Sequence, residues 1–212
     1  MENLELILPE IKTEGNLNSM TFPEIGDFNF WDLYSNRILT VDGEIDDWDY
    51  HIVKDIIRIN REDKDIPIEN RKPIIILINS CGGLLSVTNS ILDMVNISKT
   101  PVWTVNMGEA LSGGCLIFLA GERRFTTPNS WVMCHAGSGG LQGNYSEVVE
   151  QSKVYNEQVK NMGNYIMART GLDEKTYKKY KNKDWYMNMT QQLEYNFATE
   201  QLKDIDILFG EG

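Results

Sequence analysis

The chain has 212 residues, of which 42% are hydrophobic and 24% are charged, and this length and composition suit a single globular domain. Its formal net charge of −11 makes the phosphate backbone of nucleic acid an unfavourable partner, because like charges would be brought together. No apolar stretch approaches the roughly 18 residues that a membrane-spanning helix requires, so we expect neither a nucleic-acid partner nor a membrane span.

The first 35 residues are predicted to form an N-terminal arm. They contain Gly15, Pro23 and Gly26 and show no sustained hydrophobic periodicity, which favours loop or extended structure. The start of this arm lacks the basic flank and the small-residue cleavage site of a secretory signal. We therefore expect a cytoplasmic protein.

The next predicted elements are a short strand over residues 37–41 and an amphipathic helix over residues 46–61. The helix is predicted because apolar residues recur at helical spacing. The charged segment 61–72 that follows is predicted to be a solvated surface loop.

From residue 73 the pattern alternates between strands and helices. The apolar run 73–78 suits a strand that is covered on both faces, and residues 79–83 have the composition of a tight turn. A helix should follow and end before Pro101, where a strand over residues 102–107 begins.

The alternation continues with a helix over about residues 110–120 and strands over residues 124–126 and 130–134. Strands and helices that alternate on this scale predict an α/β fold with largely parallel strand pairing.

The last third of the chain is predicted to be mainly helical. Residues 136–143 are rich in glycine and serine and should be flexible, whereas residues 145–169 should form a long helix that ends at Gly171. Shorter helices are expected over residues 173–180 and 190–202. The candidate buried positions of the long helix are Val148, Val149, Val159, Met162 and Ile166.

The three cysteines, Cys81, Cys115 and Cys134, lie in mainly apolar or glycine-rich segments. They lack CxxC spacing and are too few for a metal site. We predict reduced thiols in the core and no bound metal.

The chain has two histidines, so a mechanism that needs an imidazole must use His51 or His135. His51 lies in the charged amphipathic helix, where a solvated surface histidine is expected. His135 closes a short apolar strand and opens onto the glycine-rich segment, a position that can be both fixed and accessible. From this pattern alone, His135 is either a structural histidine or a general base.

Ser112 is the candidate nucleophile, at the point where an apolar strand turns into an apolar helix. Backbone N–H groups at a helix N-terminus can stabilise an anion that develops on a bound carbonyl. The alternative is that Ser112 only caps the helix. Gly113 and Gly114 weaken that alternative, because paired glycines lower helix propensity and allow close approach of another backbone.

Gly82 and Gly83, after the predicted buried strand, form either a simple turn or a loop that presents backbone N–H groups to a ligand. The glycine patterns of nucleotide-binding loops are missing from the sequence, so we expect no ATP site.

In sequence order, these features resemble the proteolytic subunit of the Clp proteases, a family of serine peptidases. The resemblance runs from about residue 33 to residue 208. It is carried by the motifs INSCGG (78–83), GEALSGG (108–114), FTTPNSWVMCH (125–135) and GGLQG (139–143).

The resemblance implies a single ClpP-like domain over residues 36–212 after the arm of residues 1–35. Its fold would be of the ClpP/crotonase-like α/β class, with repeated β-β-α units and a protruding helix-strand handle over about residues 137–170. Ser112 matches the nucleophile and His135 the general base. Gly83 and Gly113 match the backbone donors of the oxyanion hole.

Asp184 falls where the family places the aspartate of its catalytic triad. The residues alone leave this choice open, because Asp173, Asp204 and Asp206 are nearby and an aspartate in a lysine-rich stretch is commonly just solvated.

The resemblance also implies an assembly and partners. Two heptameric rings would stack into a tetradecameric barrel, held together by the long helix and its glycine-rich strand, and unfolded polypeptide would be cleaved inside. An AAA+ unfoldase of the ClpX, ClpA or ClpC type would use ATP and feed the barrel, whereas this chain would need no cofactor. The N-terminal arm would line the axial entrance and help to dock the unfoldase.

The chain departs from the family pattern around the predicted site. Cys81 replaces a usual proline, Ala136 and Gly137 replace a glutamine-proline pair, and Leu111 and Gly113 replace the alanine and methionine that usually flank the nucleophile. Two alternatives therefore stay open, a catalytically weak ring subunit that needs an active partner and an acyl-CoA enzyme of the crotonase type.

Overall fold

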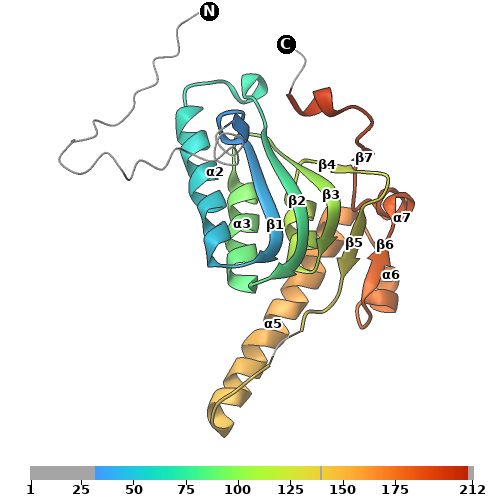
Figure 1. Ribbon diagram of the computed structural model, residues 1–212. Helices are drawn as coiled ribbons and strands as arrows, with labels where there is room; N and C mark the ends of the chain where they lie inside the picture. Colours follow the sequence, from blue (N-terminus) through green and yellow to red (C-terminus); the bar gives the residue numbers. More distant parts are fainter. Residues whose placement is uncertain (1–31, 139, 210–212) are drawn as a thin grey trace, which may run out of the picture.

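A mainly parallel sheet forms the centre of the computed structural model, which describes residues 32–138 and 140–209 (Figure 1). Its main path runs β1-β2-β3-β4-β7 with parallel pairing throughout, β5 pairs in parallel with β3, and β6 pairs antiparallel with β5. The predicted α/β fold with largely parallel pairing is therefore confirmed. The strands are β1 (Ile38–Ile45), β2 (Ile74–Gly83), β3 (Val102–Leu111), β4 (Arg123–Thr126), β5 (Trp131–Cys134), β6 (Trp185–Met187) and β7 (Glu200–Gln201).

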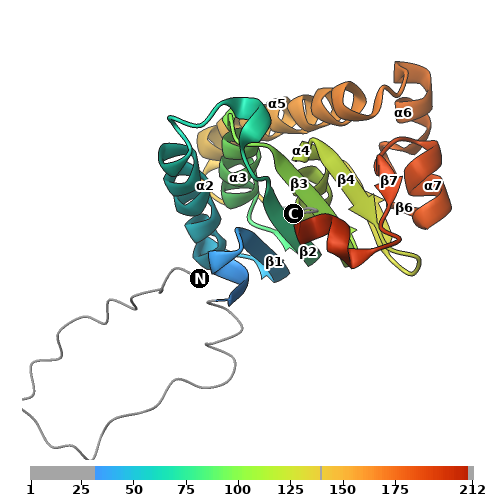
Figure 2. The ribbon, with the colours of Figure 1, turned by 90° about the horizontal axis from the view of Figure 1, so that it is seen from above.

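Helices cover one face of this sheet, and the C-terminal segment lies against the other (Figure 2). The larger apolar core lies between the sheet and the helices. A smaller core on the opposite face joins Ile75, Val105 and Phe125 to Leu208. The α-helices are α2 (Tyr50–Glu62), α3 (Leu85–Ile97), α4 (Gly113–Ala120), α5 (Tyr145–Thr170), α6 (Glu174–Tyr180) and α7 (Met189–Glu194). In the described parts of the chain, none of the helices is long and apolar enough to cross a membrane.

β2 forms because its run of β-branched and leucine residues suits a strand with neighbours on both edges, and it pairs with β1 and β3. The predicted turn over residues 79–83 is wrong, because β2 continues to Gly83. After a bulge between Gly43 and Glu44, the end of β1 pairs Glu44 with Gly82 and Ile45 with Gly83. The glycines therefore belong to the sheet edge.

The predicted helix over residues 110–120 begins too early. β3 continues to Leu111 because Ala110 and Leu111 pair with Val132 and Met133 of β5, and α4 starts only at Gly113. An apolar segment that has a strand beside it extends as strand, and local helix propensity does not decide its conformation. Ser112 is the single residue between β3 and α4.

The long helix α5 is confirmed, but its predicted burial is mostly wrong. A capping box between Asn144 and Glu147 starts it, and Gly171, with φ 76°, ends it. Of the five positions predicted to be buried, only Ile166 is buried; the other buried residues are Gly163 and Thr170. All three lie in the last third, and the rest of α5 projects from the body of the molecule (Figure 1).

The C-terminal helix predicted over residues 190–202 is also wrong in extent. α7 ends at Glu194, and the strand β7 pairs with β4. The strand β6 was not predicted; it pairs with β5 and places Trp185 in the core.

One of the three cysteines departs from the expected core position. Cys81 is exposed, whereas Cys115 and Cys134 are buried, and all three are free. Burial raises the pKa of Cys134 to about 12 and that of Cys115 well above its ordinary value, so both buried thiols stay protonated at neutral pH. Cys81 is exposed because side chains alternate between the two faces of a strand, and exposed residues alternate with buried ones at the end of β2. Most of the predicted N-terminal arm, residues 1–31, lies outside the described residues.

The charged segment 61–72 is only partly a solvated loop, because Asp63 is 1% exposed. Its carboxylate accepts hydrogen bonds from the Arg37 guanidinium at 2.7 and 2.8 Å and from the Thr100 hydroxyl at 2.9 Å. The hydrogen bonds from Arg37 are the main reason why the pKa of Asp63 lies below its ordinary value, although burial opposes that shift.

The lowered pKa of Asp63 predicts an acid-dependent loss of stability. Because the folded-state pKa lies below the unfolded one, the charged carboxylate stabilises the fold fully above about pH 5, and this stabilisation is lost as the pH falls through the folded-state pKa. Asp63→Asn is therefore expected to lower the free energy of unfolding by about 2–3 kcal/mol at pH 7 and by much less near pH 3. Urea unfolding at the two pH values measures both changes.

Asp65→Asn is the matched control, because the Asp65 side chain is 88% exposed. It should change the free energy of unfolding by less than about 0.5 kcal/mol at either pH. An equal loss at both pH values for Asp63→Asn would contradict the assignment.

Candidate active site

Ser112 occupies a sharp turn between β3 and α4. Its backbone has φ 52° and ψ −115°, a combination that residues other than glycine rarely adopt. The Ser112 N–H donates to the carbonyl oxygen of Met133 at 2.9 Å, which ties the turn to β5. Such a conformation costs about 1–3 kcal/mol, and in α/β hydrolases a strained strand-to-helix turn of this kind exposes the nucleophilic serine.

The Ser112 side chain does not cap α4, because it makes no hydrogen bond to the first turn of that helix. Its Oγ lies 2.8 Å from Nε2 of His135. The capping alternative for Ser112 is therefore excluded, and the hydroxyl is within hydrogen-bond reach of a base.

Gly113 and Gly114 let the start of α4 approach its neighbours. A Cβ atom on Gly113 would lie 2.6 Å from Oγ1 of Thr88, and one on Gly114 would lie 3.1 Å from the carbonyl oxygen of Ser80. Helix α3 and strand β2 thus occupy the space that the paired glycines leave. This close packing holds the turn at Ser112 against the end of β2.

His135 follows β5 directly, and the pairing of β5 with β3 brings it next to Ser112. The side chain of His135 is 19% exposed. His51, by contrast, lies on α2, where its Nδ1 is 2.8 Å from the carbonyl oxygen of Trp48. Of the two histidines, the structure brings only His135 to Ser112.

Asp184 lies on the far side of the His135 ring. Its Oδ1 is 3.4 Å from Nδ1 of His135, longer than the usual hydrogen bond, and its side chain is 62% exposed. Its position is set by the next residue, Trp185, which stacks on Tyr180 with ring centroids 4.1 Å apart and packs edge-on against Phe197. The aspartate is thus held through an aromatic anchor.

Gly83 and Gly113 both face the cavity at Ser112. The N–H of Leu84 donates to Ile45 of β1 at 2.8 Å, and successive N–H groups of a strand point to opposite sides, so the N–H of Gly83 points away from β1. Gly113 is the first residue of α4, so its N–H has no acceptor within that helix. Both amides can therefore bind an oxygen atom that gains negative charge.

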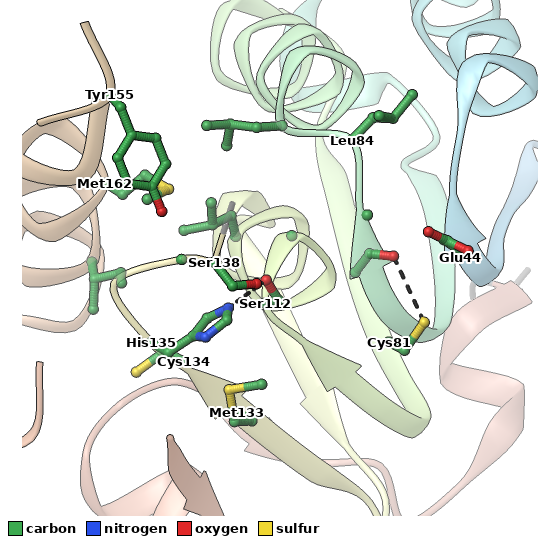
Figure 3. Close-up of a pocket in the computed structure, with 17 residues that line it drawn as sticks. Glu44, Cys81, Leu84, Ser112, Met133, Cys134, His135, Ser138, Tyr155 and Met162 are labelled. Carbon is green, nitrogen blue, oxygen red and sulfur yellow. Dashed lines mark hydrogen bonds between the residues drawn. The ribbon is translucent and has the colours of Figure 1, made fainter. Parts of the chain in front are cut away.

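These groups open into a cavity of about 460 Å³ between the sheet edge and α5 (Figure 3). Residues from β1, β2, α3, α4, β5 and α5 line it, and most of them are apolar or glycine. Figure 3 shows Ser112 and His135 facing each other, with Tyr155 and Met162 of α5 on one side and Cys81 and Glu44 on the other. The cavity thus extends to both sides of Ser112.

Several contributors to this site were not found from the sequence. Ser80 is fully buried, and its hydroxyl accepts the Gly82 N–H at 3.1 Å and donates to the Gly43 carbonyl at 2.6 Å, which holds the glycine end of β2. The aromatic cluster around Trp185 and the cavity residue Glu44 were also missed. In the sequence, these residues are marked only by lying near the end of a strand. Many residues share that position, so it does not identify them as part of the site.

The chain is thus an α/β protein with a mainly parallel sheet. A hydrogen-bonded serine-histidine pair lies at the carboxyl ends of the strands, and its serine is a candidate nucleophile. Residues 27–203 match the family model of Clp protease, and the chain therefore belongs to the Clp protease family of peptidases. The match favours that family over the crotonase-type alternative.

A curated relative agrees with this family, and a solved structure resembles the chain in fold. The chain is 33% identical over 135 residues to ATP-dependent Clp protease proteolytic subunit 2 of Treponema denticola, an alignment that covers 63% of this chain and 68% of the relative. It also resembles a mutant of ClpP1 from Listeria monocytogenes with a TM-score of 0.72 and 24% identity, over 85% of this chain and 99% of that one. The second likeness concerns the fold.

Proposed function

We propose that this chain is a serine endopeptidase that hydrolyses peptide bonds of unfolded proteins through an acyl-enzyme at Ser112. The observation that carries the proposal is the 2.8 Å contact between Ser112 Oγ and His135 Nε2 at a strained turn. Attack by a serine hydroxyl requires a base at this distance to accept its proton.

The proposed reaction has two halves. Ser112 Oγ attacks the peptide carbonyl as His135 accepts the hydroxyl proton, and the amides of Gly83 and Gly113 stabilise the oxyanion. His135 then gives the proton to the leaving amine, and the C–N bond breaks to leave an ester on Ser112. Water, deprotonated by His135, attacks this ester; the C–O bond to Ser112 then breaks, His135 returns the proton to Ser112 Oγ, and the carboxylic acid product leaves.

Asp184 is proposed to hold the His135 ring in the tautomer that carries its proton on Nδ1 and to stabilise the imidazolium that forms during each half-reaction. The 3.4 Å separation and the exposure of Asp184 make this the weakest contact of the proposed triad. Catalytic contacts that are long in a free enzyme often shorten when substrate binds.

The assembly is proposed to be a barrel of two stacked heptameric rings, fed by an AAA+ unfoldase that uses ATP. Support comes from α5, because the first two thirds of this helix bury no residue within the chain and expose Tyr145 and Val154. A helix that is largely unpacked within its own chain is expected to find its packing partner in another subunit.

A fluorophosphonate probe tests the proposed nucleophile. Ser112 Oγ should displace fluoride from the probe and form a stable phosphonate ester, and mass spectrometry of digested protein should locate the adduct on the peptide that contains Ser112. His135→Ala should abolish the adduct, because the hydroxyl then lacks its base. An assembled ring that takes no label would favour the catalytically weak ring subunit.

The anchoring of Asp184 predicts an effect of Trp185 on activity. Trp185→Ala removes the stack on Tyr180 and is expected to lower kcat for a fluorogenic peptide by about 100-fold and the free energy of unfolding by about 3–5 kcal/mol. Trp185→Phe should restore most of the stability if the alanine variant does not fold. Kinetics and urea unfolding on the same samples measure both effects.

Tyr186→Ala is the matched control, since Tyr186 is the adjacent aromatic residue but is 49% exposed. It should leave both kcat and stability near those of the original chain. Equal losses for Trp185→Ala and Tyr186→Ala would show that Trp185 has no special positioning role.

A further inference from the structure

The cavity at Ser112 has two chemically different ends. The end toward α4 and α5 is apolar, whereas the end toward β1 carries a carboxylate, that of Glu44 (Figure 3). The residues of the apolar end are Leu116, Tyr155, Met162 and Ile166. A substrate that spans the cavity would therefore meet different chemistry on the two sides of the scissile bond.

The sheet topology places Glu44 at a definite distance from the nucleophile. β1 pairs with β2 and β2 pairs with β3, whose end leads into Ser112, so Glu44 is two strands away from the nucleophile's strand. Two strand spacings amount to about 10 Å, which an extended peptide covers in about three residues. The bulge after Gly43 brings Glu44 level with Gly82 at the cavity edge.

The Glu44 carboxylate has no partner within the described part of the chain. The side chain is exposed, and no hydrogen bond or ion pair joins it to residues 32–138 or 140–209. Among the described residues that line the cavity, Glu44 is the one carboxylate, and none is lysine or arginine. Its charge is thus available to a bound ligand.

Neighbouring acidic residues differ from Glu44 in this respect. The Asp42 carboxylate accepts a hydrogen bond from the Asn79 amide at 2.9 Å, and that of Asp46 accepts the N–H of Trp48 at 2.7 Å. Neither residue lines the cavity. Glu44 is therefore distinguished by its place in the cavity as well as by its unpaired carboxylate.

We propose that Glu44 is a specificity-determining residue that favours peptides with lysine or arginine two or three residues from the scissile bond, on the side away from the apolar end of the cavity. This inference rests on the proposed peptidase function. An unpaired carboxylate attracts a cationic side chain and disfavours an anionic one, so it selects among peptides of equal length and hydrophobicity.

Internally quenched peptides test the preference. One series keeps a leucine at the cleaved bond and places lysine, glutamine or glutamate singly at each of the three positions on either side. The ratio of kcat/KM for the lysine peptide to that for the glutamine peptide is expected to be about 3 to 10 at one or two adjacent positions and near 1 elsewhere. The glutamate peptide should be the poorest substrate at the same positions, and salt should reduce the differences.

Substitutions assign this preference to one residue. Glu44→Gln should bring the lysine-to-glutamine ratio to about 1, and Glu44→Lys should invert the order of the lysine and glutamate peptides. Asp42→Asn removes the same charge from the same strand outside the cavity, so it should keep the original ratio. A ratio unchanged in Glu44→Gln, or lost equally in Asp42→Asn, overturns the proposal.

Different outcomes reject the role of Glu44 and the peptidase function. Cleavage of glutamine peptides with no preference for lysine at any position rejects the role of Glu44 and leaves the peptidase function standing. If no peptide is cleaved but a fluorophosphonate labels Ser112, protection from labelling by the lysine and glutamine peptides supplies the same ratio. If no peptide is cleaved and the fluorophosphonate does not label Ser112, both proposals are rejected.

Discussion

Ser112→Ala is expected to lower kcat for a fluorogenic peptide by about 10⁶-fold, because the reaction loses the atom that forms the acyl-enzyme. The neighbouring contacts predict that the variant still folds. The alanine keeps the N–H that donates to Met133, and the removed Oγ has His135 as its hydrogen-bond partner. Hydrolysis followed over hours, with circular dichroism to confirm folding, measures the loss.

Ser86→Ala is the matched control for this loss. Ser86 is an exposed serine on α3 that does not line the cavity, so the substitution should leave kcat within about twofold. A Ser112→Ala variant that is folded and keeps more than about 1% of the activity would show that another group carries out the attack.

Gly83→Ala is expected to damage both the sheet edge and the reaction. A Cβ atom at this position would overlap the carbonyl oxygen of Ile45 and lie 2.7 Å from the Ile45 nitrogen, and both are backbone atoms of a paired strand. Relief of this clash moves the end of β2, and with it the Gly83 amide that is proposed to bind the oxyanion. We expect a loss of about 3 kcal/mol in stability and of about 100- to 1,000-fold in kcat.

Gly171→Ala separates this clash from the general effect of placing alanine at positive φ. Gly171 has φ 76°, lies at the end of α5, and would place its Cβ where nothing lies within 4 Å. The substitution should cost about 1–2 kcal/mol of stability and leave kcat nearly unchanged. Equal effects of the two variants on kcat would contradict the role of the Gly83 amide.

The core strands could be predicted from the sequence because their residues leave few alternatives. The run of isoleucine and leucine at 74–78 is too short for a helix, and Pro101 and Gly171 end helices by their own backbone chemistry. These signals are local, and the structure follows them. Parallel pairing followed from the alternation of strands and helices.

The boundaries near the site could not be predicted, because contacts between distant segments determine them. Ala110 and Leu111 are helix formers by propensity, but pairing with β5 keeps them in a strand. Residues 79–83 have turn composition, but pairing with β1 extends them to the edge of the sheet. A strand partner 22 to 38 residues away in the sequence leaves no mark on the local pattern.

The long helix shows the same limit for burial. Val148, Val149 and Val159 are apolar and were expected to face the core, but within this chain all three are only partly buried. Periodicity identifies an apolar face and does not say which chain covers it. In the proposed barrel, the cover would come from other subunits.

The candidate site was found in part from the residues and in part by resemblance. Ser112 and His135 stood out because a serine with paired glycines and a histidine at a strand end are unusual contexts. Asp184 could not be chosen over its neighbours without the family pattern, since its position depends on Trp185, whose strand β6 was not predicted.

Trapping the acyl-enzyme is the most direct test of Ser112 as the nucleophile. The enzyme is mixed with an excess of peptide ester, quenched in acid within milliseconds to seconds, and analysed by mass spectrometry. We expect a mass increase equal to the acyl portion of the substrate, located on the peptide that contains Ser112 and missing in Ser112→Ala. Substrate turnover without any such adduct, or an adduct on another residue, would contradict this role of Ser112.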